Sequence, residues 1–177
     1  MDSTIVRERA LVAFATKHGS TAGIAEAIGE ALRSHGLEVD VRPAREVRTI
    51  DAYGPVILGS AVYMFRWQGD AVDFLKRFRR ELPAHPTWLF SSGPIGGDAK
   101  AEVKLQEVLA EQPEISGNAR GLAAKIGVRG HRTFGGRAGD EMNGVFERWV
   151  PKGDWRDFDE VRSWAASIAQ SVSVPAV

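Results

Sequence analysis

The 177-residue sequence contains no cysteine, which removes several kinds of chemistry at once. Disulfides, thiolate nucleophiles, iron–sulfur clusters and cysteine-ligated zinc are all excluded. Any redox activity must therefore come from a bound organic cofactor. Metal-binding patterns are missing too, because the four histidines, His18, His35, His85 and His131, are widely separated and show no H-x-H or H-x-x-x-H spacing.

The sequence also lacks long hydrophobic runs and any excess of charge. No apolar stretch approaches the roughly 20 residues that span a bilayer, and Met1–Arg9 has neither the apolar region nor the cleavage site of a secretion signal. The 23 basic and 23 acidic residues balance, which argues against a dedicated nucleic-acid binder. We therefore expect one cytoplasmic domain over residues 1–177, in which residues 1–9 form a short polar extension.

Five segments have the pattern of β-strands and alternate with helical patterns. Three are apolar runs typical of strands buried on both faces, at 10–15, 56–60 and 87–91, and two are less apolar, at 37–43 and 130–136. Helical spacing begins at Thr21 and ends before Gly36, recurs over 72–82, 99–111 and 118–126, and returns in a closing helix capped by Asp157 with Glu160. This alternation predicts an α/β fold: a doubly wound five-stranded parallel sheet with helices on both faces, which binds ligands at the carboxyl ends of its strands.

The loop after the first strand is rich in hydroxyl groups and contains a glycine. Its residues are Thr16, Lys17, His18, Gly19, Ser20 and Thr21. The start of the following helix offers unpaired N–H groups to a phosphate, the hydroxyls add donors, and Gly19 lets the backbone approach the anion. The alternative is that Ser20 or Thr21 only caps the helix. The loop matches neither the P-loop of nucleotide triphosphatases nor the dinucleotide-binding fingerprint.

The loops after the next two apolar strands are suited to a flat, apolar ring. Residues 59–67 carry the candidates Ala61, Val62, Tyr63, Met64 and Trp67, whose aromatic members would cover the ring. The third loop would bring backbone to the edge of the ligand through Ser92, Gly93, Pro94, Ile95, Gly96 and Gly97. The alternatives are that the aromatic residues only cover the end of the sheet, and that the third loop is a plain set of turns.

These loops resemble those of flavodoxins. Thr16, Gly19 and Thr21 match the T-x-T-G-N-T phosphate loop, whereas His18 and Ser20 depart from it. Residues 12–28, 56–67, 89–94 and 153–165 are similar to the flavodoxin-like branch that contains the menaquinone-dependent protoporphyrinogen dehydrogenases. The third loop lacks the aromatic residue that stacks on the flavin in ordinary flavodoxins, so Tyr63 and Trp67 are expected to cover the ring.

The resemblance implies noncovalent FMN, held at its 5′-phosphate by the first loop. It also implies an FMN-dependent oxidoreductase that oxidises protoporphyrinogen IX with a quinone acceptor in haem biosynthesis, or one that exchanges electrons with a redox protein. The rival interpretation is a non-catalytic module of the same fold that binds an anion or a protein partner without flavin turnover. The basic run 76–80 is either a solvated helix face or a docking surface for an acidic partner or an anionic membrane. His131 is either a packed side chain or a proton donor.

Overall fold

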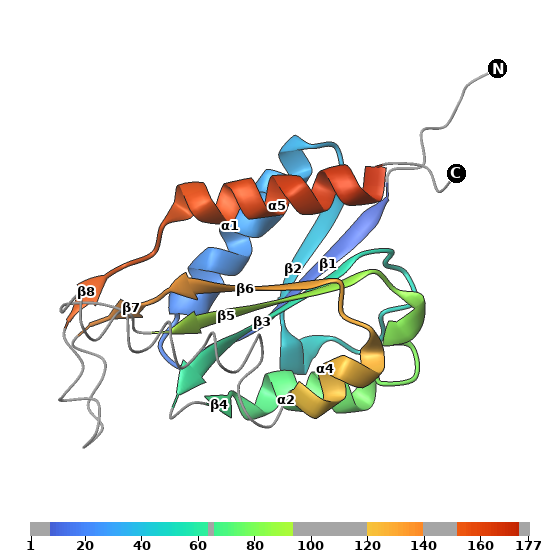
Figure 1. Cartoon of the computed structure of the whole chain (residues 1–177), viewed down its shortest axis with the longest axis horizontal. Helices are drawn as coiled ribbons and strands as arrows, with labels where there is room; N and C mark the ends of the chain where they lie inside the picture. Colours follow the sequence, from blue (N-terminus) through green and yellow to red (C-terminus); the bar gives the residue numbers. More distant parts are fainter. Residues whose placement is uncertain (1–7, 64–65, 94–119, 140–151, 174–177) are drawn as a thin grey trace.

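The computed structural model describes residues 8–63, 66–93, 120–139 and 152–173. Five parallel strands form its central sheet: β1 (Arg9–Ala15), β2 (Glu38–Pro43), β3 (Val56–Tyr63), β5 (Thr87–Gly93) and β6 (Gly130–Gly135). Their order is β2-β1-β3-β5-β6 (Figure 1). β2 therefore lies on one side of β1, whereas β3, β5 and β6 follow one another on the other side, and the chain changes direction between β2 and β3. Ligands of doubly wound sheets bind at this change of direction. The predicted fold class is confirmed.

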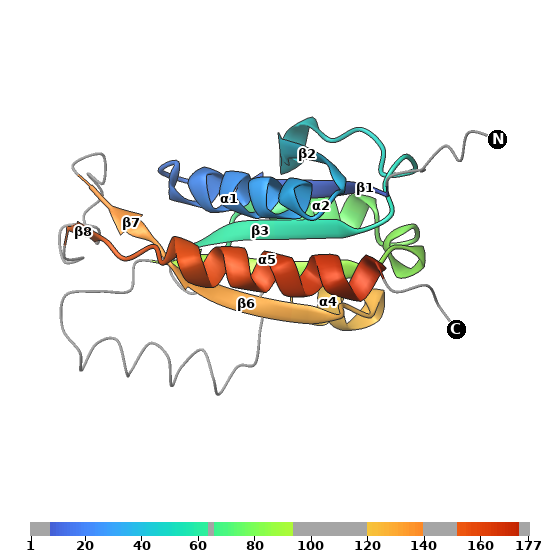
Figure 2. The same cartoon turned by 90° about the horizontal axis from the view of Figure 1, so that it is seen from above.

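Helices cover both faces of the sheet, as Figures 1 and 2 show. On one face lie α1 (Ser20–Ser34) and α5 (Phe158–Ser173), and on the other α2 (Gly69–Arg77) and α4 (Arg120–Ile126). The pleat of β1 divides its side chains between two cores: Val12 packs with the cluster under α1 and α5, and Leu11 with the cluster under α2 and α4. Because β1 is buried on both faces, it reads in the sequence as a continuous apolar run.

Two helix ends differ from the pattern in the sequence. The stripe over 72–82 predicts one helix, but α2 ends at Arg77, and turns lead to a short 3-10 helix at Leu82–Ala84. At the start of α5, Asp157 accepts the N–H groups of Asp159 and Glu160, as the capping pattern predicts. The Glu160 carboxylate, however, accepts a hydrogen bond from Arg132 on β6. The helix expected over 99–111 lies outside the described residues.

The basic run 76–80, which begins in the last turn of α2, contributes side chains to the interior of the fold. The Arg77 guanidinium donates to the carbonyl oxygens of Ala44 (2.8 Å) and Val47 (2.9 Å), which fixes the segment that follows β2. Phe78 is buried in the core, and Lys76 forms an ion pair with Asp73 on the same helix. These residues therefore contribute to the fold as well as to the surface.

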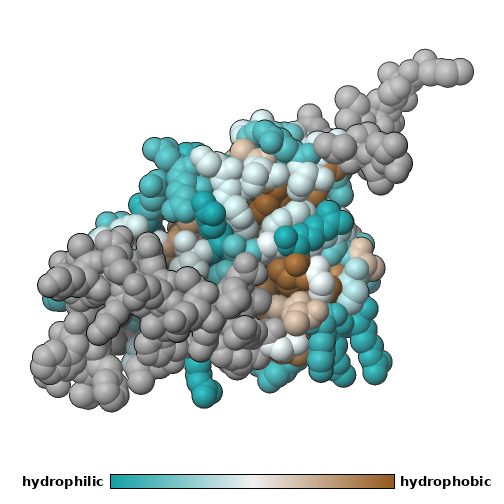
Figure 3. All heavy atoms as spheres, viewed as in Figure 1, coloured by the Kyte–Doolittle hydropathy of each residue, from teal (hydrophilic) through white to brown (hydrophobic). Residues whose placement is uncertain are grey.

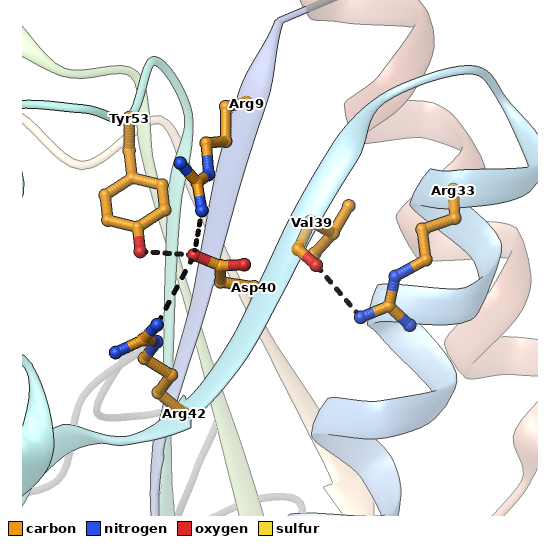
Figure 4. A network of polar contacts seen from close by, with 6 residues as sticks. All are labelled: Arg9, Arg33, Val39, Asp40, Arg42 and Tyr53. Carbon is orange, nitrogen blue, oxygen red and sulfur yellow. Dashed lines mark hydrogen bonds and ion pairs between the residues drawn. The ribbon is translucent and has the colours of Figure 1, made fainter.

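A polar network fastens the edge strand β2 to its neighbours (Figure 4). The Asp40 carboxylate accepts hydrogen bonds from the Tyr53 hydroxyl (2.6 Å), in the segment before β3, and from Arg9 on β1 (2.8 Å). The Tyr53 hydrogen bond is the main reason that the pKa of Asp40 is lowered, and burial together with this carboxylate raises the pKa of Tyr53. The network thus fixes β2, an edge strand of the sheet, to β1 and to the segment before β3.

Two short antiparallel pairings follow the carboxyl ends of strands of the main sheet, and the second of them forms a separate two-stranded sheet. In the first, β4 (Arg66–Trp67) pairs antiparallel with the end of β3. In the second, β7 (Arg137–Ala138), which follows β6, pairs antiparallel with β8 (Gly153–Asp154), which precedes α5. Hydrophilic residues cover much of the described surface in Figure 3. None of the described helices has the length and hydropathy needed to cross a membrane.

Candidate functional site

An open cleft lies at the carboxyl edge of the sheet, where all three predicted loops contribute, and its empty space, open solvent included, is about 410 Å³. From the predicted set, it is lined by Thr16, Lys17, His18, Ser20, Thr21, Ala61, Val62, Tyr63, Ser92 and Gly93. Two further lining residues, Gly136 and Arg137, were not expected from the sequence. Met64, Pro94, Ile95, Gly96 and Gly97 lie outside the described residues. The cleft is therefore in the place that the fold predicts, but it includes a fourth segment.

Gly19 gives the first loop its shape. Its φ of 84° lies in the left-handed region, which an L side chain adopts at a cost, and this turn starts α1 without a side-chain cap. The Gly19 N–H donates instead to Thr16 Oγ1 at 2.8 Å. Because Thr16 accepts here, its own hydroxyl proton is left to donate to another group. The side chain of Thr16 thereby combines a structural role with a donor at the rim of the cleft.

The two hydroxyls that open α1 connect the first loop to distant strands. Ser20 Oγ accepts the backbone N–H of Arg137 at 2.9 Å, and Thr21 Oγ1 lies 2.8 Å from Ser92 Oγ in a buried pair. The alternative, that Ser20 or Thr21 only caps the helix, is therefore wrong: Gly19 is the N-cap residue, no side chain caps the helix, and both hydroxyls join the first loop to other strands. Ser20, like Thr16, accepts a bond and keeps a proton to donate.

The second segment is an antiparallel hairpin rather than the loop that the sequence suggests. β3 continues to Tyr63, and Val62 pairs with Trp67 and Tyr63 with Arg66. Tyr63 is half-buried and lines the cleft. The ammonium group of Lys17 lies 3.2 Å from the centroid of the Tyr63 ring, so a cation from the first loop covers one face of this aromatic side chain.

The interpretation of Trp67 as a ring-covering residue is wrong for this structure. Only 3% of Trp67 is exposed, it packs in the core under α2, and it is not among the lining residues. Its indole N–H donates to Ser91 Oγ at 2.9 Å. Pairing with Val62 directs its side chain into the core, because the register of the hairpin decides which face each residue occupies. Trp67 supports the cleft from below and does not line it.

His131 completes a buried hydrogen-bond chain with Trp67 and Ser91. Its Nε2 lies 2.9 Å from Ser91 Oγ, and burial lowers the pKa of His131 to about 4. The indole can only donate, so Ser91 accepts from Trp67 and can donate to Nε2 of a neutral His131. The ring is then neutral at pH 7, which favours the interpretation of a packed side chain over that of a proton donor.

The segment that carries Arg137 is held by close backbone contacts. Gly136 donates its N–H to the carbonyl oxygen of Gly93 on β5, and its own carbonyl accepts the N–H of Trp155 at 3.0 Å. A Cβ atom on Gly135 would lie 2.1 Å from the Trp155 carbonyl oxygen, so only glycine fits this crossing. These contacts fix the position of the Arg137 backbone beside the first turn of α1.

Among the described residues that line the cleft, the charged side chains are all basic. Lys17 and Arg137 are the cationic lining residues, and none of the described lining residues is acidic. No group of three or more potential metal ligands occurs among the described residues. The cleft therefore offers hydroxyl donors, helix-end N–H groups and cations, a combination suited to an anionic organic ligand.

Comparisons with known proteins agree with this fold. Residues 11–126, more than half of the chain, match the family model of the flavodoxin domain. A flavodoxin from the domain Archaea has a similar structure at 18% identity, with a TM-score of 0.55 over 94% of this chain and 99% of that one. For a mutant flavodoxin from Pseudomonas aeruginosa the identity is 14% and the TM-score 0.61, over 94% and 99% of the two chains.

A larger protein contains the same fold as one of its parts. The rubredoxin oxygen:oxidoreductase from Desulfovibrio gigas is 15% identical, with a TM-score of 0.57, and the match covers 94% of this chain and 37% of that one. No curated protein sequence matches this chain closely enough to count as a relative. The structural matches show the fold, and the family model shows the membership: the chain belongs to the flavodoxin family.

Proposed function

We propose that the cleft binds FMN and that the chain is a redox protein that exchanges electrons through the bound flavin. The observation that carries this proposal is the hydroxyl arrangement at the start of α1. Thr16 and Ser20 each accept a backbone N–H and so keep a proton for an anion, beside a helix end whose N–H groups and dipole favour negative charge. Family membership supports the choice of FMN.

The residues present fit the two ends of this cofactor. Thr16, Ser20 and the backbone N–H groups of Ser20 and Thr21 in the first turn of α1 would hold the phosphate. Ala61, Val62, Tyr63 and Gly93, which combine apolar side chains with accessible backbone, would border the ring. FMN supplies the electron chemistry when bound, and the protein positions it and sets its electrostatic surroundings.

Titration with FMN, riboflavin and FAD tests the proposal. We expect the purified protein to show a flavin spectrum, to bind FMN more tightly than riboflavin, and to bind FAD no better than FMN. Thr16→Val removes a donor from the phosphate end and should weaken FMN binding while leaving riboflavin binding unchanged. Thr49→Val is the matched control, because Thr49 is exposed in the segment before β3 and bonds to Asp51. Equal affinities of the wild-type protein for FMN and riboflavin would remove the phosphate assignment.

At the level of the substrate, we propose that this redox protein oxidises protoporphyrinogen IX with a quinone as acceptor. The support is the resemblance of residues 12–28 and 56–67 to that branch of the family. Under anaerobic conditions, protoporphyrinogen IX should bleach the flavin absorbance of the FMN-loaded protein, and an added quinone should restore it. If a redox protein partner bleaches the flavin and the porphyrinogen does not, the chain is an electron carrier instead. Failure to bind any flavin would favour the non-catalytic module.

A further inference from the structure

The segment between β8 and α5 supports one wall of the cleft. Trp155 donates its backbone N–H to the carbonyl oxygen of Gly136 at 3.0 Å, and its own carbonyl crosses Gly135 so closely that only glycine fits there. Gly136 in turn donates its N–H to the carbonyl oxygen of Gly93, and both of these glycines line the cleft. The wall formed by residues 136–137 therefore depends for its position on a segment that lies outside the cleft.

Arg156 fixes this outer segment to the rest of the fold. Its guanidinium donates two hydrogen bonds to the Asp154 carboxylate on β8, one of them from Nε at 2.8 Å, and its backbone N–H donates a third at 3.2 Å. The same side chain lies against α1, where a Cβ atom on Gly23 would come within 2.8 Å of it, and its guanidinium carbon lies 5.1 Å from the centre of the Phe158 ring on α5. Only 17% of the Arg156 side chain is exposed, and a fork of this kind holds its partners more firmly than an ordinary surface ion pair.

The contacts of Arg156 lead to a hydroxyl group at the start of α1. Asp154 is the ladder partner of Arg137 in the β7–β8 pair, and the backbone N–H of Arg137 donates to Ser20 Oγ at 2.9 Å. This bond occupies one acceptor position of the Ser20 hydroxyl, whose proton is thereby directed away from the Arg137 backbone. Without it, the hydroxyl could rotate and donate to a neighbouring backbone carbonyl instead. The orientation of a lining hydroxyl therefore depends on where the β7–β8 pair is held.

We propose that Arg156 is a positioning residue that sets the preference of the cleft for a flavin bearing a phosphate. This inference rests on the proposed FMN site, and Arg156 acts there without touching the ligand. Through Asp154 and the β7–β8 pair, it keeps the Arg137 backbone N–H on Ser20 Oγ, and so keeps the Ser20 proton available to a phosphate oxygen. A donor that is fixed in advance loses less freedom when the ligand binds. Riboflavin has no phosphate and gains nothing from this arrangement.

The test compares the dissociation constants of FMN and riboflavin in four proteins: wild type, Arg156→Met, Arg156→Lys and Arg162→Met. Arg156→Met should weaken FMN binding about three- to tenfold, because a hydrogen bond to a charged group is impaired, and should change riboflavin binding less than about twofold. Arg156→Lys keeps the charge without the fork, should fall between, and decides the question if Arg156→Met does not fold. Arg162→Met is the matched control: this arginine pairs with Asp159 at 2.6 Å on the exposed face of α5 and is not a lining residue, so both constants should be unchanged.

A double-mutant cycle with Ser20→Ala provides a measurement that a merely structural role would not affect. In the Ser20→Ala protein, adding Arg156→Met should weaken FMN binding less than about twofold, because the hydroxyl that Arg156 positions is already gone. Unchanged FMN affinity in Arg156→Met and Arg156→Lys would overturn the inference and leave the FMN site standing. An equal loss of riboflavin binding, or the full loss of FMN affinity in the Ser20→Ala background, would do the same. A wild-type protein that binds no FMN, or binds it no better than riboflavin, would overturn the proposed FMN site and this inference with it.

Discussion

Replacing Trp67 by phenylalanine tests whether this side chain supports the core or contacts a ligand. The change removes the donor of the 2.9 Å hydrogen bond to Ser91 and leaves a smaller ring in a site where the tryptophan is 3% exposed. The lost hydrogen bond costs about 0.5–1.5 kcal/mol and the missing volume roughly 1–2 kcal/mol. We expect the free energy of unfolding to fall by about 2–3 kcal/mol in total, and by about 3–5 kcal/mol for Trp67→Ala.

A double-mutant cycle with Ser91→Ala separates the hydrogen bond from the packing. Ser91→Ala leaves both the Trp67 indole and His131 without their partner, which costs about 1–3 kcal/mol. Once that bond is gone, Trp67→Phe should lose only the packing contribution, so its effect should shrink by about 1 kcal/mol. Urea unfolding followed by far-ultraviolet circular dichroism measures all four proteins, and its slope shows whether the unfolded state has changed.

Flavin binding decides between the two roles of Trp67. Because Trp67 does not line the cleft, the folded Trp67→Phe protein should bind FMN within a few-fold of the wild-type affinity and show the same flavin emission. The opposite result has two parts: a free energy of unfolding within about 0.5 kcal/mol of the wild-type value, as for most surface substitutions, and a flavin that binds more weakly and fluoresces more brightly. That result would mean that Trp67 contacts the ring, and the assignment to the core would fail.

The remaining predictions concern four other positions. Gly19→Ala should cost about 1–2 kcal/mol of stability from its φ of 84° alone, whereas Gly69→Ala, equally open to solvent but with an ordinary φ, should be neutral or stabilising in the same thermal melts. Gly59→Ala should be strongly destabilising, because its Cβ would lie 1.9 Å from the Phe90 ring; a melting temperature equal to that of the wild type would contradict the packing. The Lys17 ammonium and a flavin ring would compete for one face of the Tyr63 ring, so Lys17→Met should strengthen riboflavin binding several-fold. Weaker riboflavin binding in the titration would refute this competition. His131 takes up a proton in the unfolded chain below about pH 6.5 but in the folded chain only near pH 4. The free energy of unfolding should therefore fall by about 2–3 kcal/mol as the pH is lowered through this interval. In His131→Gln, the plot of unfolding free energy against pH should be flatter over the same interval.

The sheet could be predicted because each central strand carries its own signal. Strands buried on both faces are apolar at nearly every position, and the runs beginning at Ala10, Val56 and Thr87 show this without reference to the rest of the chain. The rule that ligands bind at the carboxyl ends then placed the cleft. The first loop was found for the same reason: its hydroxyls and glycine are consecutive in the sequence.

The face on which Trp67 lies could not be predicted, because it depends on the register of a hairpin. The residues between Tyr63 and Arg66 are Met64 and Phe65, and they include no glycine, proline or asparagine to announce a tight turn. Residues 62–65 are also all apolar or aromatic, so the sequence shows no alternation of apolar and polar residues that would reveal which face each side chain occupies. A one-residue change of register would turn Trp67 to the other face, so composition alone gives no basis for choosing.

Arg137 was missed for a different reason: it lies 117 residues after Ser20 in the sequence, and only the fold brings the two residues together. The whole chain has a formal net charge of 0, and this total argued only against a dedicated nucleic-acid binder. Charges act over roughly one Debye length, about 8–10 Å in physiological salt, so a ligand responds to the few groups around it and not to the sum. At the carboxyl edge of the sheet, the described lining residues of the cleft include the basic residues Lys17 and Arg137. A neutral protein can therefore contain a site selective for anions, and only the fold shows which of its balanced charges lie close enough to a ligand to matter.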